Sequence, residues 1–227
     1  MILRPRRALL KALREVKLPL ETRRSVRTSD ADNKAGAVIG AVIQYYKSCW
    51  TVGKFTRKHP ELAAIACQYA KNFFPHFKFS SVMINKGSSA LHVDRMNLGP
   101  SVIVSLGDHT GGELWQYPDR VIKIRNKPKL TDGLLPHMTL PYKGERFSLV
   151  YFNMYGNRSP LSREDAVFLR SLGFHSVVNN PTSKPLPRAD LLDEAAFTLH
   201  KRGISRRAIG DYKNNHIKTR RSVRKSQ

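Results

Sequence analysis

Two stretches, INKGSSALHVD (residues 84–94) and HMTLPYKGERFSLVYF (residues 137–152), decide how this chain folds. Successive side chains of a β-strand point to opposite faces, so His92 and Asp94 share one face while Val93 points away. His137, which opens the second stretch, can join them from a facing strand. Two imidazoles and one carboxylate on one side of an ion leave the opposite coordination positions open for other molecules. The spacing therefore predicts a metal site at His92, Asp94 and His137.

The strand after His137 carries a second candidate group. Residues 141–144 (Pro-Tyr-Lys-Gly) indicate a turn, and beyond it Arg146 and Ser148 share one strand face. A guanidinium is a rigid fork that matches the two oxygens of a carboxylate. An inward Arg146 beside an inward Ser148 would therefore bind a carboxylate, and a surface arginine on a strand edge is the alternative.

Together these motifs resemble the Fe(II)/2-oxoglutarate-dependent dioxygenases. The shared pattern is His-x-Asp, a later His, and Arg-x-Ser about nine residues beyond it. The segment SVIVSLGDHTGGEL (residues 101–114) is similar to the strand, turn and Gly-Gly element of that family. HVDRMNLGPS (residues 92–101) with GGELW (residues 111–115) resembles a subgroup from algae, protists and their viruses or mobile elements, related to the TET/JBP nucleic-acid oxygenases.

The resemblance covers about residues 37–174 and carries expectations for fold and site. It implies a mainly β fold with flanking helices and a double-stranded β-helix (jelly-roll) core. It also implies Fe(II) at the predicted metal site, with 2-oxoglutarate and O₂ as co-substrates. Arg146 would anchor 2-oxoglutarate with help from Ser148, and Asn85 is a candidate for the other end of the co-substrate.

The hydrophobic pattern agrees with an antiparallel β core. Pro60 suits the first turn of a helix, and apolar residues at helical spacing follow it up to Phe73. In a jelly roll this helix would support the outside of the larger sheet. Alternation and turn residues predict strands at about residues 77–85, 89–94, 101–107, 113–117, 120–125, 137–141 and 145–153.

Charge divides the 227-residue chain into three parts and indicates a polyanionic partner. Forty Lys and Arg against 17 Asp and Glu give a net charge of +23. We assign residues 1–35 to a basic extension, 36–175 to the jelly-roll domain, and 176–227 to a second basic extension. Such a field favours a polyanion, nucleic acid (DNA or RNA) above all, or an anionic membrane surface, and an ordinary solvated basic protein is the alternative.

Three basic segments have two interpretations each. Residues 1–20 can form a basic amphipathic helix, either a transit peptide or an arm for nucleic acid. Residues 120–129 form either a basic ledge or an ordinary wet strand face. Residues 191–225 could form a helix-turn-helix module or a disordered tail with one amphipathic helix. The peptide TRRSVRTS (residues 22–29) also recurs as TRRSVRKS (residues 219–226), which no physical argument explains.

Compartment and membrane signals are few. Cys49 and Cys67 give no disulfide framework, so reduced, intracellular surroundings are expected, nuclear or cytoplasmic unless residues 1–20 direct the chain to an organelle. No apolar run approaches the roughly 20 residues that span a membrane. His109 lies near the Gly-Gly turn, and its loop position predicts exposure to solvent.

The substrate is the least defined expectation. Arg95 and Asn97 follow Asp94 and should line the mouth of the site, whereas Trp115 is expected to fill the barrel rather than stack on a base. The primary hypothesis is an oxygenase that hydroxylates a C–H bond of a nucleobase, which a duplex would have to flip out. The alternatives are a protein side-chain hydroxylase, or an inactive nucleic-acid-binding or structural protein of a mobile element or virus.

Overall fold

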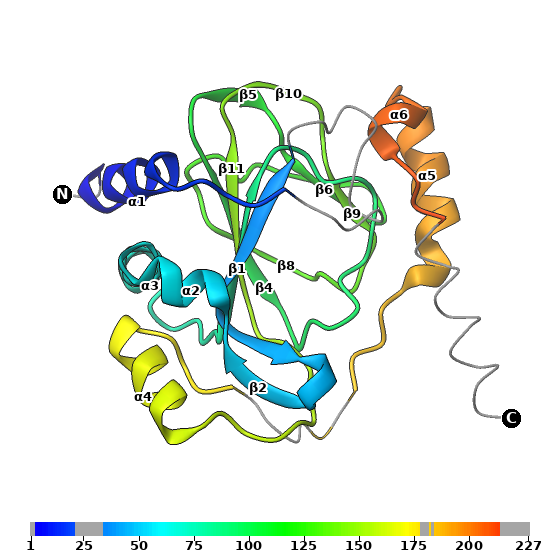
Figure 1. Ribbon diagram of the computed structural model, residues 1–227. Helices are drawn as coiled ribbons and strands as arrows, with labels where there is room; N and C mark the ends of the chain where they lie inside the picture. The colour runs from blue at the N-terminus through cyan, green and yellow to red at the C-terminus, as the bar shows by residue number, and fades with distance from the viewer. Residues whose placement is uncertain (1–2, 21–33, 178–181, 183, 214–227) are drawn as a thin grey trace, which may run out of the picture.

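A six-stranded antiparallel sheet forms the centre of the molecule (Figure 1). The computed structural model describes residues 3–20, 34–177, 182 and 184–213. The strand order of the central sheet is β2-β1-β3-β11-β4-β8. Its members are β1 (Ala35–Gln44), β2 (Cys49–Val52), β3 (Ser81–Lys86), β4 (Ser101–Leu106), β8 (Lys129–Thr131) and β11 (Phe147–Phe152).

A smaller sheet faces the inner side of the central one. Its order is β7-β6-β9, formed by β6 (Leu114–Gln116), β7 (Arg120–Ile122) and β9 (His137–Thr139). The segment at His92 adds to it through a single antiparallel bridge with His137. The ribbon of β5 (His109–Gly111) and β10 (Tyr142–Gly144) closes one end. The chain thus alternates between two antiparallel sheets, which confirms the expected jelly-roll core.

The two faces of the central sheet have different environments. Leu149 and Tyr151 of β11 point outward into the large apolar core, where the Tyr151 hydroxyl donates to the carbonyl of Ala66 at 3.1 Å. Ala66 belongs to α3 (Pro60–Phe73), so this helix supports the sheet from outside, as predicted. Val150 points inward and packs with Leu114 of the small sheet. Alternation along one strand therefore separates a helix-covered face from the interior of the barrel.

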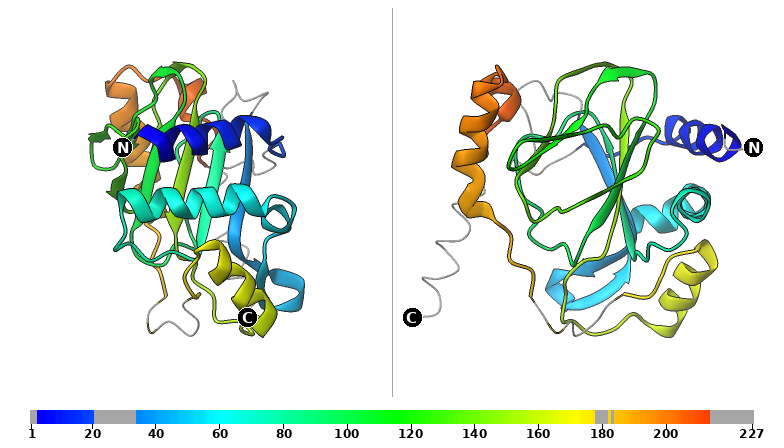
Figure 2. Two further views of the ribbon diagram at one scale, coloured as in Figure 1. Left: turned by 90° about the vertical axis from the view of Figure 1, so that its left-hand side faces the viewer. Right: turned by 180° about the vertical axis from the view of Figure 1, so that it is seen from behind.

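The first helix, α1 (Leu3–Glu15), belongs to the folded body. Leu9 and Leu13 are buried in the large core, and α1 lies alongside α3 across the outer face of the sheet (Figure 2). Because one side of the helix contributes core residues, residues 3–15 are a structural layer, whatever other role they have. Residues 21–33, which include the first copy of the repeated peptide, lie outside the described residues.

Helix α5 (Leu192–Lys201) covers the outer face of the small sheet. Its Leu192, Ala195, Ala196 and Leu199 form one core with the outward residues of the small sheet, namely Leu91, Val93, Trp115 and Met138. Trp115 is fully buried there, so it packs in a core and is not available to a base. The basic C-terminal region therefore also contributes a structural layer.

The helix-turn-helix expected in the C-terminal region stays a prediction. Helix α6 (Arg206–Ile209) has four residues, and the apolar side of α5 is used against the barrel. The third expected helix, residues 219–225, lies outside the described residues. No helix in the described part of the chain has both the length and the apolar character to cross a membrane.

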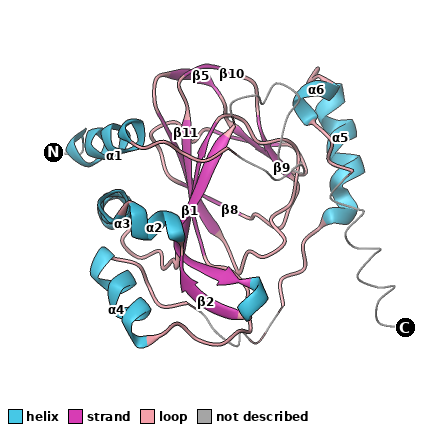
Figure 3. Ribbon diagram, viewed as in Figure 1, coloured by secondary structure: helices cyan, strands magenta, loops and turns pink. Residues whose placement is uncertain are grey.

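The remaining helices lie at the other end of the central sheet. They are α2 (Lys54–Lys58), α4 (Arg163–Leu172) and the short helix at Tyr45–Lys47 (Figure 3), whereas the short helix at Ala189–Leu191 leads directly into α5 and packs with its core. Ser162 caps α4 by accepting from the backbone nitrogen of Asp165, and Gly173 ends it with a φ of 100°. Asp165 in turn accepts from the backbone nitrogen of Val52 at 3.2 Å, which attaches α4 to the sheet.

The expected strands are present, although one of them is reduced to a single bridge. The structure also has five strands that the sequence pattern did not predict. The stretch 89–94 contributes only the bridge at His92, because it pairs with β9 over a very short length. The pattern did not predict β1, β2, β5, β8 or β10. Strands β1 and β2 lie in an apolar and a mixed run without clean alternation, and β5, β8 and β10 have three residues each, too few to show a period.

Candidate metal and co-substrate site

The backbones of His92 and His137 hold two of the expected metal ligands side by side. The nitrogen of His92 donates to the carbonyl of His137 at 3.0 Å, and the reverse bond measures 2.9 Å. Residues paired in this way project their side chains to the same face. The two imidazole rings accordingly lie with centroids 4.3 Å apart.

Each imidazole also has a backbone partner that fixes its orientation. His92 Nδ1 lies 2.6 Å from the carbonyl oxygen of Ala90, and His137 Nδ1 lies 2.8 Å from that of Leu135. A carbonyl only accepts, so both Nδ1 atoms carry the proton in these bonds and both Nε2 atoms retain a lone pair. This is how metal-binding histidines are commonly oriented.

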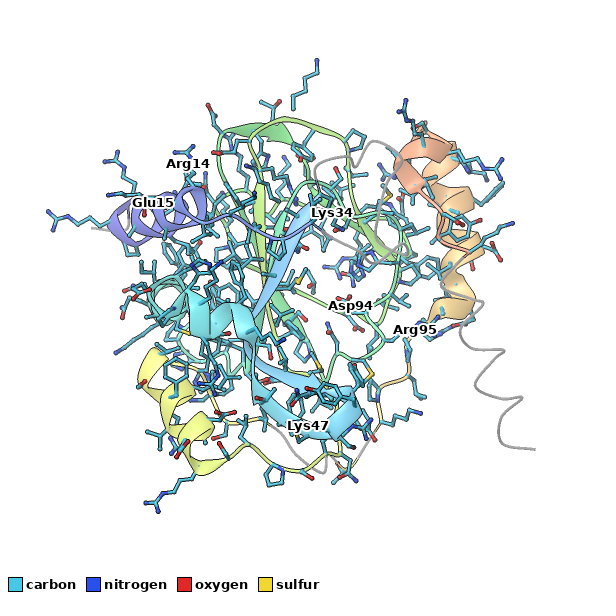
Figure 4. All side chains as sticks on the ribbon, viewed as in Figure 1. Arg14, Glu15, Lys34, Lys47, Asp94 and Arg95 are labelled. Atoms are coloured by element: carbon cyan, nitrogen blue, oxygen red, sulfur yellow. The ribbon has the colours of Figure 1, made fainter. Side chains whose placement is uncertain are left out.

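Asp94 completes the cluster. Its Oδ1 lies 3.7 Å from His92 Nε2, and its Oδ2 lies 3.7 Å from His137 Nε2. Ligand bonds of about 2.1 Å allow two donors on one ion to be at most about 4.2 Å apart, so both spacings fit a shared ion. Within the described residues these three form the one group of three or more His, Cys, Asp or Glu with metal-binding geometry. Figure 4 shows Asp94 in the space between the central strands and the C-terminal helix.

Asn97 and Gly133 hold Asp94 in place. The Asp94 backbone nitrogen donates to the carbonyl of Gly133 at 2.8 Å, and Asn97 Nδ2 lies 3.4 Å from the Asp94 carboxylate. The same amide donates to Ser101 Oγ at 3.0 Å. Asn97 is only 5% exposed, so it lies beneath the carboxylate, whereas the sequence had indicated a position at the open mouth. Its role towards a substrate stays a prediction.

Arg146 is a large charged side chain that is buried near the site. The side chain is 2% exposed, with Nε donating to the carbonyl of Gly112 at 3.2 Å and Nη1 to that of Gly87 at 3.3 Å. No described carboxylate forms an ion pair with it, although Glu113 lies near enough to influence it. Burial lowers the pKa of Arg146 to about 10. Its guanidinium also lies 5.5 Å from the ring centre of Tyr142. A buried cation without an ion-pair partner is stabilised when an anion pairs with it.

Polar side chains continue inward from Arg146 across three strands. Ser148 of β11 is in register with Asn85 of β3 on one side and with Ser105 of β4 on the other. All three are buried, and Ser105 Oγ has no hydrogen-bond partner among the described residues. Asn85 thus lies beside Ser148, in the same row of the sheet. A row of donors next to a buried guanidinium is suited to a ligand with several oxygen atoms.

His109 was placed wrongly by the sequence analysis. It was expected in solvent but is 2% exposed, with Nδ1 3.0 Å from the carbonyl of Gly111 and Nε2 without a partner among the described residues. Its pKa is lowered, first by burial and then by the positive charge of Arg146. His109 lies in the three-residue strand β5, opposite Gly144 of β10, and so short a strand carries no sequence signal that would have found it.

Arg95 lies next to Asp94 and is partly exposed, on the side of the C-terminal segment in Figure 4. Its expected place at the mouth of the site and its contact with a substrate both stay predictions. Among the residues predicted for the site, the three metal ligands come together on the small-sheet side. Arg146, Ser148 and Asn85 come together on the inner face of the central sheet.

Comparisons with known proteins give structural similarities alone. No protein-family model matches the chain, and no curated protein matches it. The chain is similar to the structure of NgTET1 in complex with 5mC DNA (14% identity, 63% of this chain, 71% of that one, TM-score 0.43). It is also similar to a 2OG-Fe(II) oxygenase family protein from Burkholderia pseudomallei (20% identity, 69% of this chain, 81% of that one, TM-score 0.44). A third similar structure is a Pseudomonas putida prolyl-4-hydroxylase (15% identity, 68% of this chain, 88% of that one, TM-score 0.40).

Proposed function

We propose that this protein is an Fe(II)- and 2-oxoglutarate-dependent dioxygenase that hydroxylates a C–H bond. The observation that carries the proposal is the combination of two oriented imidazoles with one carboxylate, and a buried arginine with no carboxylate partner among the described residues. A facial set of two His and one carboxylate leaves positions on the ion for a co-substrate and O₂.

The chain's own groups divide the work. His92, Asp94 and His137 would hold Fe(II) through Nε2, a carboxylate oxygen and Nε2. The carbonyls of Ala90 and Leu135 keep both rings in the tautomer that presents Nε2. Arg146 would pair with the distal carboxylate of 2-oxoglutarate, and the Ser148 hydroxyl would donate to the same group. Bound Fe(II) supplies the centre where 2-oxoglutarate and O₂ give succinate and CO₂, with the second oxygen atom entering the substrate C–H bond.

For the main substrate we favour a nucleobase in DNA or RNA. The net charge of +23 supports this choice, because a polyanion is attracted to such a surface before any specific contact forms. A base in a duplex would have to leave the stack to reach a site enclosed between two sheets. A protein side chain is the competing substrate class, and the experiment below separates the two.

The test is succinate formation by purified protein supplied with Fe(II), 2-oxoglutarate and O₂. Separate reactions contain single-stranded DNA, duplex DNA, RNA or a protein extract. His137→Ala is compared with His76→Ala, which alters an exposed histidine far from the cluster. We expect His137→Ala to lose at least about 100-fold in succinate formation and His76→Ala to retain it.

Co(II) binding, followed by its visible spectrum, gives a second readout that does not need turnover. We expect Co(II) to bind the wild type and His76→Ala more tightly than His137→Ala. Equal turnover and equal Co(II) binding by the two variants would reject the metal site. Stimulation by the protein extract alone would replace the nucleobase with a protein side chain.

A further inference from the structure

Two basic segments that the proposed chemistry does not use meet at one edge of the molecule. Residues 3–17 contain six Lys or Arg and one Glu, and residues 120–129 contain five Lys or Arg and no acid. The first segment includes α1, and the second runs from β7 to β8, crossing between the two sheets. Nothing in the sequence indicates that the two segments meet, because more than a hundred residues separate them.

A hydrogen bond joins the two segments directly. Arg6 Nη2 donates to the carbonyl of Asn126 at 3.0 Å, while its guanidinium lies 5.8 Å from the ring centre of Phe73. Asn126 has a φ of 57°, so the backbone turns there towards α1. Arg6 is therefore engaged in the fold and joins the two basic segments to each other. Figure 2 shows α1 lying across the helix-covered face of the sheet, with its N-terminal end towards one edge.

The acidic groups along this edge already have partners. Glu145 accepts from Arg14 Nε at 2.8 Å, Asp108 pairs with Arg125 at 3.4 Å, and Glu15 pairs with Lys11 at 3.8 Å. Among the exposed cations of the two segments, several have no ion pair with a described residue. We call five of these the basic surface: Arg4, Arg7, Lys123, Lys127 and Lys129.

We propose that the basic surface binds the phosphate backbone of a nucleic acid, away from the metal site. Clustered cations without counter-charges repel one another and are stabilised by a polyanion. Phosphates spaced along a strand match cations spread over a helix and a loop. An anionic membrane fits less well, because Leu9 and Leu13, the apolar side of α1, are buried in the core and cannot insert into lipid.

The helix half of the basic surface lies on the side of the molecule opposite α5. Helix α1 lies opposite α5 in both side views (Figures 1 and 2), and α5 covers the small sheet that holds the histidines. Contacts at the basic surface would therefore add affinity for any sequence of nucleic acid without touching the reacting base. The inference rests on the proposed function only for the choice of nucleic acid as the polyanion.

The experiment measures binding of full-length protein to a fluorescent 30-nucleotide single strand and to a duplex, without Fe(II) or 2-oxoglutarate, over a range of salt. One variant reverses the loop half (Lys123→Glu, Lys127→Glu, Lys129→Glu) and another reverses the helix half (Arg4→Glu, Arg7→Glu). The matched control reverses three exposed cations on α2 and α4, namely Lys58→Glu, Arg163→Glu and Arg170→Glu. Vesicles with and without phosphatidylserine test the lipid alternative.

We expect the loop variant to bind at least about tenfold more weakly at 0.15 M salt. The slope of log affinity against log salt should fall by roughly 2 for the loop variant and roughly 1 for the helix variant on single strands. The control should keep a slope within about 0.5 of the wild type.

Equal losses in the control and the surface variants would overturn the inference, because net charge alone would explain them. The inference would also be overturned if the salt slope of either the loop variant or the helix variant were unchanged. Vesicle binding that depends on these charges, with nucleic-acid binding unaltered, would overturn it as well. Succinate formation separates this result from the proposed chemistry. If the surface variants bind nucleic acid as the wild type does and succinate is still formed, only the basic surface is rejected. If the surface variants lose binding but the wild type forms no succinate, the basic surface is supported and the oxygenase is rejected.

Discussion

Gly112 and Arg146 occupy positions that exclude any side chain at residue 112. Arg146 Nε donates to the Gly112 carbonyl at 3.2 Å, and a Cβ added to Gly112 would lie 2.8 Å from the same nitrogen. The second glycine of the Gly-Gly turn therefore leaves room for the buried guanidinium. Gly111 has a different neighbour, because its Cβ would lie 2.5 Å from the carbonyl oxygen of Pro141.

Gly112→Ala should impair 2-oxoglutarate binding by displacing Arg146. We expect the KM for 2-oxoglutarate to rise by about tenfold or more, with Fe(II) affinity unchanged. Gly203→Ala is the matched control, since Gly203 has nearly the same φ (77° against 75°) but no atom within 4 Å of the added Cβ. It therefore carries the same backbone strain without the contact. A KM that rises equally in both variants would assign the effect to strain.

Asn97→Ala should weaken metal binding through Asp94. The amide that holds the carboxylate would be lost, and changes in groups that orient a ligand commonly cost 10–100-fold in metal affinity. Asn157→Ala, at an exposed position, serves as the control. Isothermal titration with Co(II) measures the change. Unaltered Co(II) affinity would show that Asn97 does not position Asp94.

Leu199→Ala should destabilise the whole barrel, because α5 forms a core with the small sheet. Truncation of a fully buried leucine costs about 2–5 kcal/mol. Phe197 lies on the same helix and is 59% exposed, so Phe197→Ala should change the unfolding free energy by less than about 1 kcal/mol. Urea unfolding, followed by circular dichroism, compares the two. A Leu199→Ala protein as stable as the wild type would show that α5 is a detachable extension.

His109→Gln should make stability less sensitive to acid. Burial lowers the pKa of His109 in the folded protein, and the charge of Arg146 lowers it further. As pH falls through the ordinary histidine pKa of about 6.5, His109 becomes protonated in the unfolded chain before it does in the folded protein. The wild type therefore loses stability. Glutamine cannot titrate, so the variant should lose less between pH 7 and pH 5. Unfolding free energies of both proteins at these two pH values measure the difference, and equal losses would contradict it.

Local pattern was enough for the elements that carry their own periodicity. Alternation in RFSLVYF (residues 146–152) places Arg146, Ser148 and Val150 on one face, and the structure agrees, with Leu149 and Tyr151 in the outer core. The helix that begins at Pro60 also lies where the sequence puts it. Short strands such as β5 could not be predicted in this way, and this is why His109 was placed in solvent.

The sequence by itself determined the chemistry available to this protein. His92, Asp94, His137 and Arg146 have the donor types and strand periods of a metal and carboxylate site, and these properties are local. Only the tertiary structure decided which groups meet. Two backbone hydrogen bonds between strands join His92 to His137, and one from Arg6 to Asn126 joins α1 to a distant basic loop. Such contacts depend on strand register and helix packing, which are set by the burial of the whole chain rather than by any segment alone.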